Sequence, residues 1–158
     1  MFYTRVTLPS DIAKTHELEE FIDSIMGDCH LPEQYRGIVS LPLMEAVCNG
    51  IRHGNRNQPD SHISIQCQQE DEKITFSVSD EGQGFPYQDF IENGTYLKSH
   101  GLSSIMSLCE EVRFLNKGAT ICFSIPLPSA AAPIPVREIS STKAIKALKE
   151  SHKQLSVD

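Results

Sequence analysis

The chain has no tryptophan, and aromatic residues make up only 7% of its 158 positions. It has no apolar run long enough to cross a bilayer, and its first residues lack the apolar core of a signal peptide. Basic residues are scarce as well, since 14 Lys and Arg against 21 Asp and Glu give a formal net charge of −7. These shortages argue against a membrane span, and against nucleic acid as a direct partner, because phosphate binding needs a basic surface.

The five cysteines are an odd number, and no two of them have the short spacing typical of a metal site. Most fall in apolar segments, where a cysteine behaves as a small buried hydrophobic residue. We therefore expect a reduced, cytoplasmic protein.

Composition divides the chain into two parts near Leu127. Nine of the 14 basic and 18 of the 21 acidic residues precede Ser129, so the remainder carries a small positive charge. The stretch from 126 to 135 is rich in proline and alanine and is typical of an extended linker. We expect one domain over 1–127, followed by a linker and a basic tail over 128–158. In the tail, residues 141–155 fit either a helix that docks on an acidic partner or a solvated extension.

Three helical regions are indicated by apolar residues at helical spacing. The first begins at Ser10 or Asp11 and ends at Gly27. The second runs from Pro32 to about His53, and because Pro42 removes a backbone hydrogen bond, we expect a kink or two helices there. The third carries apolar residues from Leu102 to Cys109, and a short helix is expected near 89–92.

Strict alternation of apolar and polar residues predicts half-buried strands over 63–68 and 74–79, joined by a turn at 70–72. Further strands are expected at 3–8, 112–115 and 120–125. The order of helices and strands predicts an α+β fold. We expect a two-layer sandwich in which helices cover one face of a mixed, mostly antiparallel sheet and leave the other face polar.

Two motifs carry the functional signal. Glu45, Asn49 and His53 stand four residues apart, which places three polar groups on one stripe of a helix. The segment Asp80-Glu81-Gly82-Gln83-Gly84 sets an acid and two spaced glycines at the end of a strand, where backbone can approach a flat ligand closely. With Gly101 at the start of another helix, these motifs indicate a nucleotide site built from two helices and a loop.

The motifs resemble those of the Bergerat-fold (GHKL) ATP-binding superfamily. The segment from Glu45 to Asn55 is similar to its N-box, and the segment from Asp80 to Gly84 to its G1 box. Ser99-His100-Gly101 looks like a G2 box with one glycine missing, and Gly118-Ala119-Thr120 matches the closing Gly-x-Thr. The resemblance covers residues 3–127, and it is greatest to the anti-sigma-factor serine/threonine kinases.

This resemblance implies a site for ATP with Mg²⁺. Asp80 would accept a hydrogen bond from the adenine amino group, while Gly82 and Gly84 would let the loop lie against the purine. Asn49 would bind Mg²⁺ through its side-chain oxygen. Glu45 would be the catalytic residue, which either orients or deprotonates the attacking hydroxyl or acts through water on the metal.

Further cofactor contacts follow from the same resemblance. Amides at Gly101 would receive phosphates at a helix start, and Thr120 would lie near the adenine. Lys98 and His100 fit either phosphate contacts or exposed loop positions. His53 belongs to the predicted cofactor site, but its place at a helix end favours capping or packing over catalysis. Taken alone, Glu45 and Asn49 also fit a solvated helix face, and the segment at Asp80 also fits a simple turn.

Two functions are compatible with these residues. The first is a kinase that binds Mg·ATP, phosphorylates a small STAS-type antagonist on serine or threonine, and exchanges it for a sigma factor. The second is a non-catalytic interaction module of the same fold, which binds nucleotide weakly or not at all. Ser99 and Pro42 would favour this module because they alter the phosphate lid and the helix of Glu45. A histidine kinase is less favoured, since no long dimerisation helix is evident. Anti-sigma kinases are often homodimers, and the sequence shows no dimer face.

Overall fold

The computed structural model describes residues 1–94 and 100–127, and Met1–Leu127 form one compact unit. The expected linker and basic helix after Leu127 lie outside the described residues, as do Lys98 and Ser99. The strands are β1 (Phe2–Pro9), β2 (His62–Gln69), β3 (Lys73–Ser79), β4 (Glu110–Leu115) and β5 (Thr120–Pro126). The helices are α1 (His16–Asp28), α2 (Arg36–Asn49), α3 (Tyr87–Glu92) and α4 (His100–Leu108).

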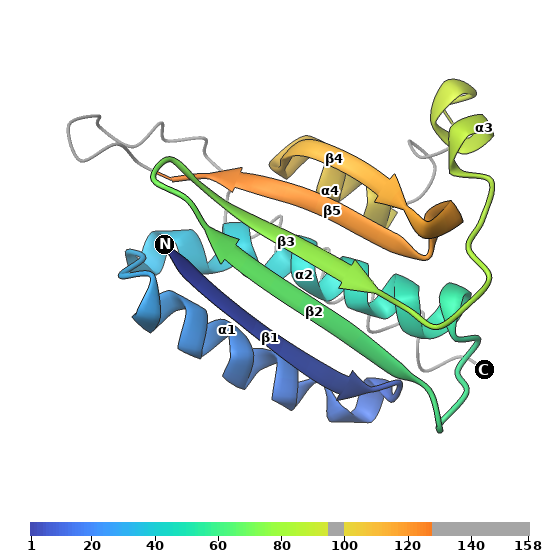
Figure 1. Ribbon diagram of the computed structural model, residues 1–158, viewed down its shortest axis with the longest axis horizontal. Helices are drawn as coiled ribbons and strands as arrows, with labels where there is room; N and C mark the ends of the chain where they lie inside the picture. The colour runs from blue at the N-terminus through green and yellow to red at the C-terminus, as the bar shows by residue number, and fades with distance from the viewer. Residues whose placement is uncertain (95–99, 128–158) are drawn as a thin grey trace. The chain divides into compact units, whose positions relative to one another are not determined.

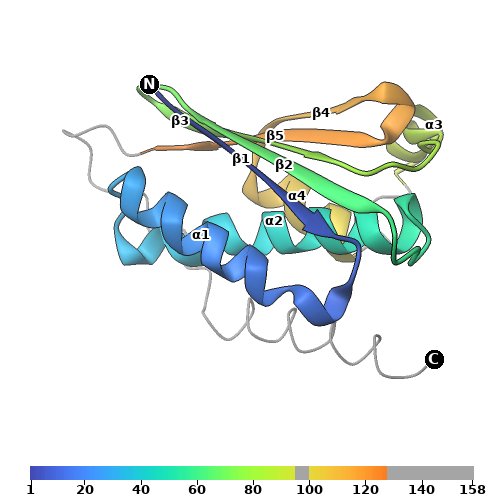
Figure 2. The ribbon, with the colours of Figure 1, turned by 60° about the horizontal axis from the view of Figure 1, so that its bottom comes forward.

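Five strands form one sheet in the order β1-β2-β3-β5-β4, and α1, α2 and α4 cover one of its faces (Figure 1 and Figure 2). The expected two-layer α+β fold is therefore confirmed. All four strand pairings are antiparallel, so the parallel pair that a mixed sheet would contain is not found among the described strands. Hairpins join β2 to β3 and β4 to β5, and hairpins can only place neighbouring strands antiparallel.

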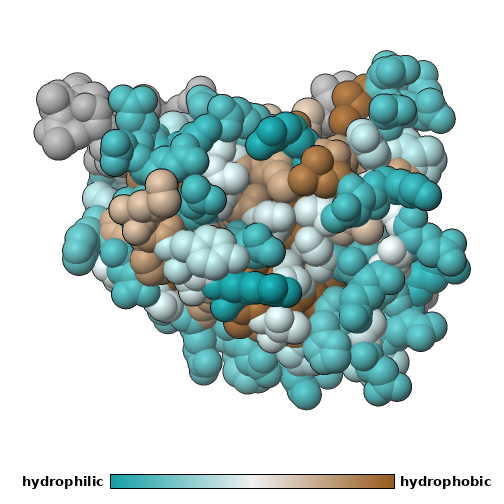
Figure 3. Space-filling view, viewed as in Figure 1, coloured by the Kyte–Doolittle hydropathy of each residue, from teal (hydrophilic) through white to brown (hydrophobic). Residues whose placement is uncertain are grey.

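The alternation in the strands sorts their side chains between the two faces of the sheet. Ile74, Phe76 and Val78 are at most 3% exposed under the helices. The Phe76 ring packs against Phe123 of the neighbouring strand, with centroids 5.6 Å apart. The other face carries mainly serine, threonine and glutamine, and hydrophilic and near-neutral colours predominate there in Figure 3. Burial of the first set against the helices fixes the register of the sheet.

The helix boundaries differ from the sequence prediction at two places. Asp11 does act as a cap, since its carboxylate accepts the backbone N–H of Ala13 at 2.9 Å, but the capped element is a 3₁₀ turn over Ile12–Lys14. The helix α1 begins only at His16. Of the two outcomes expected at Pro42, the division into two helices is not found, because α2 is one helix that runs through this residue. Eight residues of α2 are buried, including Pro42, and tertiary packing of this kind outweighs local propensity.

The regular hydrogen bonding of α2 changes at its C-terminal end instead. Residues Gly50–Gly54 form a π-helical turn, in which the backbone N–H of Asn55 donates to the Gly50 carbonyl at 2.7 Å. Such turns insert one extra residue per turn and occur often at functional sites. Among residues 1–94 and 100–127, none of the helices has the length and apolar character needed to cross a membrane.

Candidate nucleotide site

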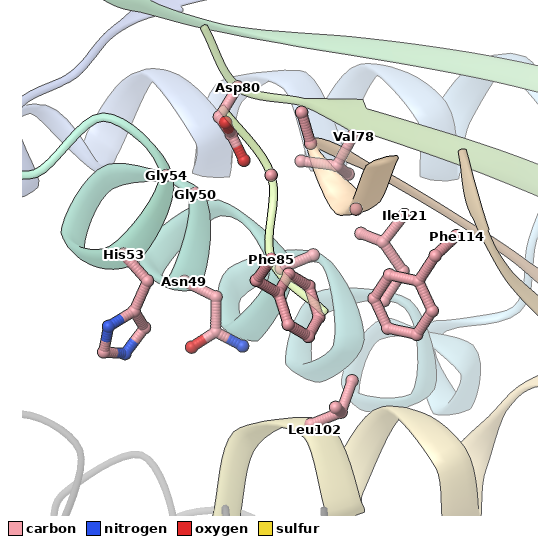
Figure 4. A pocket seen from close by; sticks show the side chains of 14 residues that line it. Asn49, Gly50, His53, Gly54, Val78, Asp80, Phe85, Leu102, Phe114 and Ile121 are labelled. Carbon is pink, nitrogen blue, oxygen red and sulfur yellow. The ribbon is translucent and has the colours of Figure 1, made fainter. Parts of the chain in front are cut away.

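A cavity of about 450 Å³ lies between the C-terminal half of α2, the start of α4 and the adjoining ends of β3, β4 and β5 (Figure 4). Most of its walls are apolar, and its polar side chains are Asn49, His53 and Asp80. The other lining residues are Ala46, Gly50, Gly54, Val78, Gly84, Phe85, Leu102, Phe114, Gly118, Ala119 and Ile121. A largely apolar cavity with a few convergent polar groups is the usual form of a small-molecule site.

Asp80 stands at the point where β3 ends and the chain enters the next loop. Its backbone N–H donates to the carbonyl of Ala119 at 2.9 Å, which fixes the residue to the start of β5. The Gly82 N–H donates to its Oδ1 at 2.8 Å. Burial raises the pKa of the Asp80 carboxyl above its usual value, and the hydrogen bond from Gly82 opposes that shift. Asp80 is therefore a partly desolvated acceptor, which gains most from a ligand that supplies a hydrogen-bond donor.

Glycines around Asp80 allow the backbone to approach its carboxylate. A Cβ at Gly54 would overlap the carboxylate itself, and a Cβ at Gly82 would overlap the carbonyl oxygen of Gly54. Gly84 has a φ of +81° and lies against the carbonyl of Lys117, so it needs glycine for its conformation as well as for space. The close backbone approach that the spaced glycines predict is therefore present.

Two of the three residues on the predicted helical stripe line the cavity. Asn49, at the end of α2, and His53, in the π-helical turn that follows, lie side by side on one wall of the cavity, as Figure 4 shows. Glu45, one turn earlier, is 8% exposed and does not line the cavity. The buried carboxylate of Glu45 points toward α4, where a Cβ at Gly101 would overlap its Oε2.

The start of α4 is therefore held against the same stripe of α2. Gly101 lies in the first turn of α4, and a Cβ placed on it would also lie 3.5 Å from the Asn49 Nδ2. The structure thus brings Glu45, Asn49 and Gly101 together, beside the cavity that holds Asp80. Lys98 and the side chain of His100 lie outside the described residues.

Thr120 does not line the cavity. It pairs with Ser79 in the sheet, and the two hydroxyl oxygens are 2.9 Å apart. The Asn116 side-chain amide also donates to the Thr120 hydroxyl, at 2.9 Å. The neighbouring pair, Val78 and Ile121, faces the cavity, so Thr120 is directed to the opposite face of the sheet. Ala119, rather than Thr120, lies at the cavity wall.

The sequence prediction did not include the apolar residues that line the cavity. Strand alternation identifies Val78 and Ile121 as inward-facing strand residues, but their place in the site depends on the pairing of β3 with β5. Phe85 and Phe114 come from distant segments, and their rings meet edge to face with centroids 5.3 Å apart. Tyr87 stacks on Phe114 at 5.1 Å. No periodic pattern marks Phe85, so nothing in the sequence singles it out.

The donor groups allow a simple test of metal binding. In the described part of the chain, no three His, Cys, Asp or Glu side chains cluster so as to hold a metal ion. Asn49 offers one amide oxygen, which is a hard ligand suited to Mg²⁺. Proteins commonly bind Mg²⁺ through one or two side chains and complete its shell with water and substrate phosphates. The residues present therefore fit a metal ion that arrives with a phosphorylated ligand, rather than one held by the protein alone.

Comparison with known families assigns the fold. A family model described as the histidine kinase-like ATPase domain matches residues 8–125, which contain every residue that lines the cavity. No curated protein matches the chain. Since the family model spans well over half of the sequence, and the observed α+β fold agrees with it, the chain belongs to the histidine kinase-like (GHKL-type) ATPase domain family.

Proposed function

We propose that the cavity binds ATP, with the adenine next to Asp80. The observation that carries this proposal is the position of the Asp80 carboxylate, which is partly desolvated at one end of an apolar cavity and closely flanked by Gly54 and Gly82. An adenine ring offers flat apolar faces to the walls and an amino donor to the carboxylate. A base without that donor would leave a buried acceptor unpaired, which costs about 1–3 kcal/mol and explains how such a site selects its base.

The other end of the ligand would lie along α2, near the start of α4. Asn49 lines the cavity and supplies the oxygen that suits Mg²⁺. Gly101 lies in the first turn of α4, where backbone N–H groups have no partner within the helix itself and can donate to phosphate oxygens. Asp80 and Asn49 stand on different walls of the same cavity, an arrangement that suits a ligand with a base at one end and phosphates at the other (Figure 4).

Within the family, we propose the activity of an anti-sigma-type serine/threonine kinase, in keeping with the resemblance of its N-box and G1 box. Bound ATP supplies the phosphoryl group. A serine or threonine oxygen of a small STAS-type antagonist forms the new bond to the γ-phosphorus, the bond to the bridging oxygen breaks, and ADP leaves. Glu45 either accepts or orients the hydroxyl proton, or acts through water on the metal. Phosphorylation would then exchange the antagonist for a sigma factor on the protein surface.

A non-catalytic interaction module is the second candidate function. Glu45 is buried against Gly101 and does not line the cavity, and this placement favours a domain that holds nucleotide without transferring phosphate. In that case the nucleotide would control only which partner is bound.

Calorimetric titration of Mg·ATP into the purified protein tests the site, with Asp80→Asn as the variant and Gly37→Ala as the matched control. A Cβ added at Gly37 would meet nothing within 4 Å, so this control leaves the cavity intact. Binding that is lost in Asp80→Asn and kept in Gly37→Ala supports the adenine site. Absence of binding by the folded wild-type protein overturns it and leaves the nucleotide-free interaction module.

A further inference from the structure

Three residues around the loop that follows β3 form a closed ring of hydrogen bonds. The Glu81 backbone N–H donates to the Asn55 Oδ1 at 2.7 Å, and the Asn55 Nδ2 donates to the His62 carbonyl at 3.0 Å. The His62 backbone N–H closes the ring by donating to the Glu81 Oε2 at 2.6 Å. The ring thus joins three segments that are separate in the sequence. Asn55 follows the π-helical turn, His62 begins β2, and Glu81 lies in the loop after β3.

Asn55 is the buried member of this ring, with an exposed fraction of 4%. Its side chain accepts one hydrogen bond and donates two, the second to the Ser10 hydroxyl at 3.2 Å. Only an amide offers both an acceptor and two donors in this short length, since aspartate at neutral pH only accepts and leucine does neither. Position 55 therefore requires asparagine for its three side-chain hydrogen bonds, and not only because asparagine suits the end of a helix.

The ring holds the segment that carries the candidate adenine contact. Glu81 lies between Asp80 and Gly82, and its N–H and its carboxylate both take part in the ring. Gly82 donates to Asp80 and packs on the carbonyl of Gly54, the residue before Asn55. Fixing Glu81 against Asn55 therefore fixes the backbone on both sides of the carboxylate.

We propose that Asn55 and Glu81 are positioning residues for the nucleotide site. Neither lines the cavity, so they act through the backbone of residues 80–82 and not by touching the ligand. This inference rests on the proposed function, because it concerns the affinity and base selectivity of the same site. Without the ring, the Asp80 carboxylate loses its fixed direction, and the site binds ATP less tightly and discriminates less against GTP.

The exposed member of the ring gives the sharpest test. The Glu81 side chain is 59% exposed, so its truncation removes a ring bond with little loss of packing. Glu81→Ala removes the acceptor for the His62 N–H, whereas Glu81→Gln keeps a side-chain oxygen that can accept it. Ser10→Ala is the matched control, because it removes a hydrogen bond from the same Asn55 amide but leaves the ring closed.

Two quantities are measured for each variant: backbone amide exchange at Gly82 in the ligand-free protein by NMR, and the Kd values for Mg·ATP and Mg·GTP. In Glu81→Ala we expect faster exchange at Gly82, ATP binding weakened by about three- to tenfold, and a smaller preference for ATP over GTP. Glu81→Gln and Ser10→Ala should stay within about twofold of the wild type. Asn55→Ala should weaken ATP binding by about tenfold or more, because a buried donor and acceptor lose their partner.

Each contrary result has a distinct meaning. Unchanged exchange at Gly82 in Glu81→Ala would show that the ring does not hold the loop, and would overturn the proposal. Faster exchange with unchanged affinity and selectivity would reduce the ring to a structural contact, which also overturns it. The wild-type protein is titrated first. If it binds no ATP, the proposed function fails and this inference fails with it. If it binds ATP and Glu81→Ala binds equally well, only the inference fails.

Discussion

The backbone of Gly54 packs directly against the carboxylate of Asp80, so closely that any side chain at position 54 would occupy the space of the carboxylate. One residue belongs to the π-helical turn that ends α2, and the other follows β3. Their contact joins the helical layer to the sheet at the candidate adenine site. We therefore expect the geometry of this contact to affect both stability and ligand binding.

Substitution of Gly54 by alanine should therefore damage both properties. The new methyl group must displace Asp80 or the π-helical turn, and overpacking of this kind typically costs about 1–3 kcal/mol. We expect a lower free energy of unfolding in urea and a loss of Mg·ATP binding by calorimetry. Gly37→Ala in α2 is the control and should be neutral or slightly stabilising, since its Cβ meets nothing within 4 Å. Equal behaviour of the two variants would contradict the contact.

Asp80 should lower the stability of the free protein while it enables binding. Because burial raises its pKa, the folded state holds the proton more tightly than the unfolded state does. The free energy of unfolding should thus decrease as the pH rises from the pKa of Asp80 in the unfolded chain, about 3.9, through its higher pKa in the folded protein. Above the folded pKa, the charged carboxylate lowers the free energy of unfolding by its full amount. Asp80→Asn removes this penalty.

Urea unfolding at pH 4 and pH 7 checks the prediction for Asp80. At pH 7 the Asp80→Asn variant should be more stable than the wild type, and the difference should shrink at pH 4. The same variant should bind Mg·ATP at least about tenfold more weakly, because the charged acceptor is lost. A variant that is less stable at pH 7 would show that the carboxylate is stabilised by its surroundings.

Glu45→Gln separates phosphoryl transfer from nucleotide binding. Glutamine keeps the size of the buried side chain, so the affinity for Mg·ATP should stay within about twofold. Loss of a general base typically lowers the rate by about 10²–10⁴-fold, and we expect transfer of radiolabelled phosphate to the antagonist to decrease accordingly. Transfer at the wild-type rate would exclude Glu45 from the chemistry. Absence of transfer by the wild type with a bound antagonist would favour the non-catalytic module.

Local patterns in the sequence were sufficient to locate the strands. Each predicted strand agrees with the observed strand to within two residues at either end, because alternation follows directly from burial of one face. The same alternation places Thr120 on the outer face, since Ile121, Phe123 and Ile125 pair with the inward-facing Val78, Phe76 and Ile74. The motif resemblance had placed Thr120 near the adenine, and the register of β5 does not bring it to the cavity wall.

Long-range features of the site could not be predicted in this way. The ring around Asn55 depends on hydrogen bonds between residues up to 26 positions apart. The contact between the Phe85 and Phe114 rings depends on where β4 ends. The π-helical turn at Gly50–Gly54 has no periodic signature of its own. Tertiary contacts decide each of these features, so local propensity carries no information on them.

At Pro42, the cost of proline to the helix and the gain from its burial and stiffness nearly cancel in the free energy of unfolding. Alanine at this position would restore an N–H donor to the Ile38 carbonyl and remove a helix-breaking ring, a gain of about 3 kcal/mol by intrinsic propensity. It would also delete about two buried methylenes, at about 0.8 kcal/mol each, and give the unfolded chain about 0.4–1 kcal/mol more conformational freedom. Since Pro42 is buried and α2 is continuous, we expect Pro42→Ala to change the free energy of unfolding by less than about 1 kcal/mol and the ATP affinity by less than about twofold. Urea unfolding and calorimetry measure the two quantities. A large change in affinity alone would mean that the proline sets the direction of side chains in the later turns of α2, as expected from the sequence for Glu45.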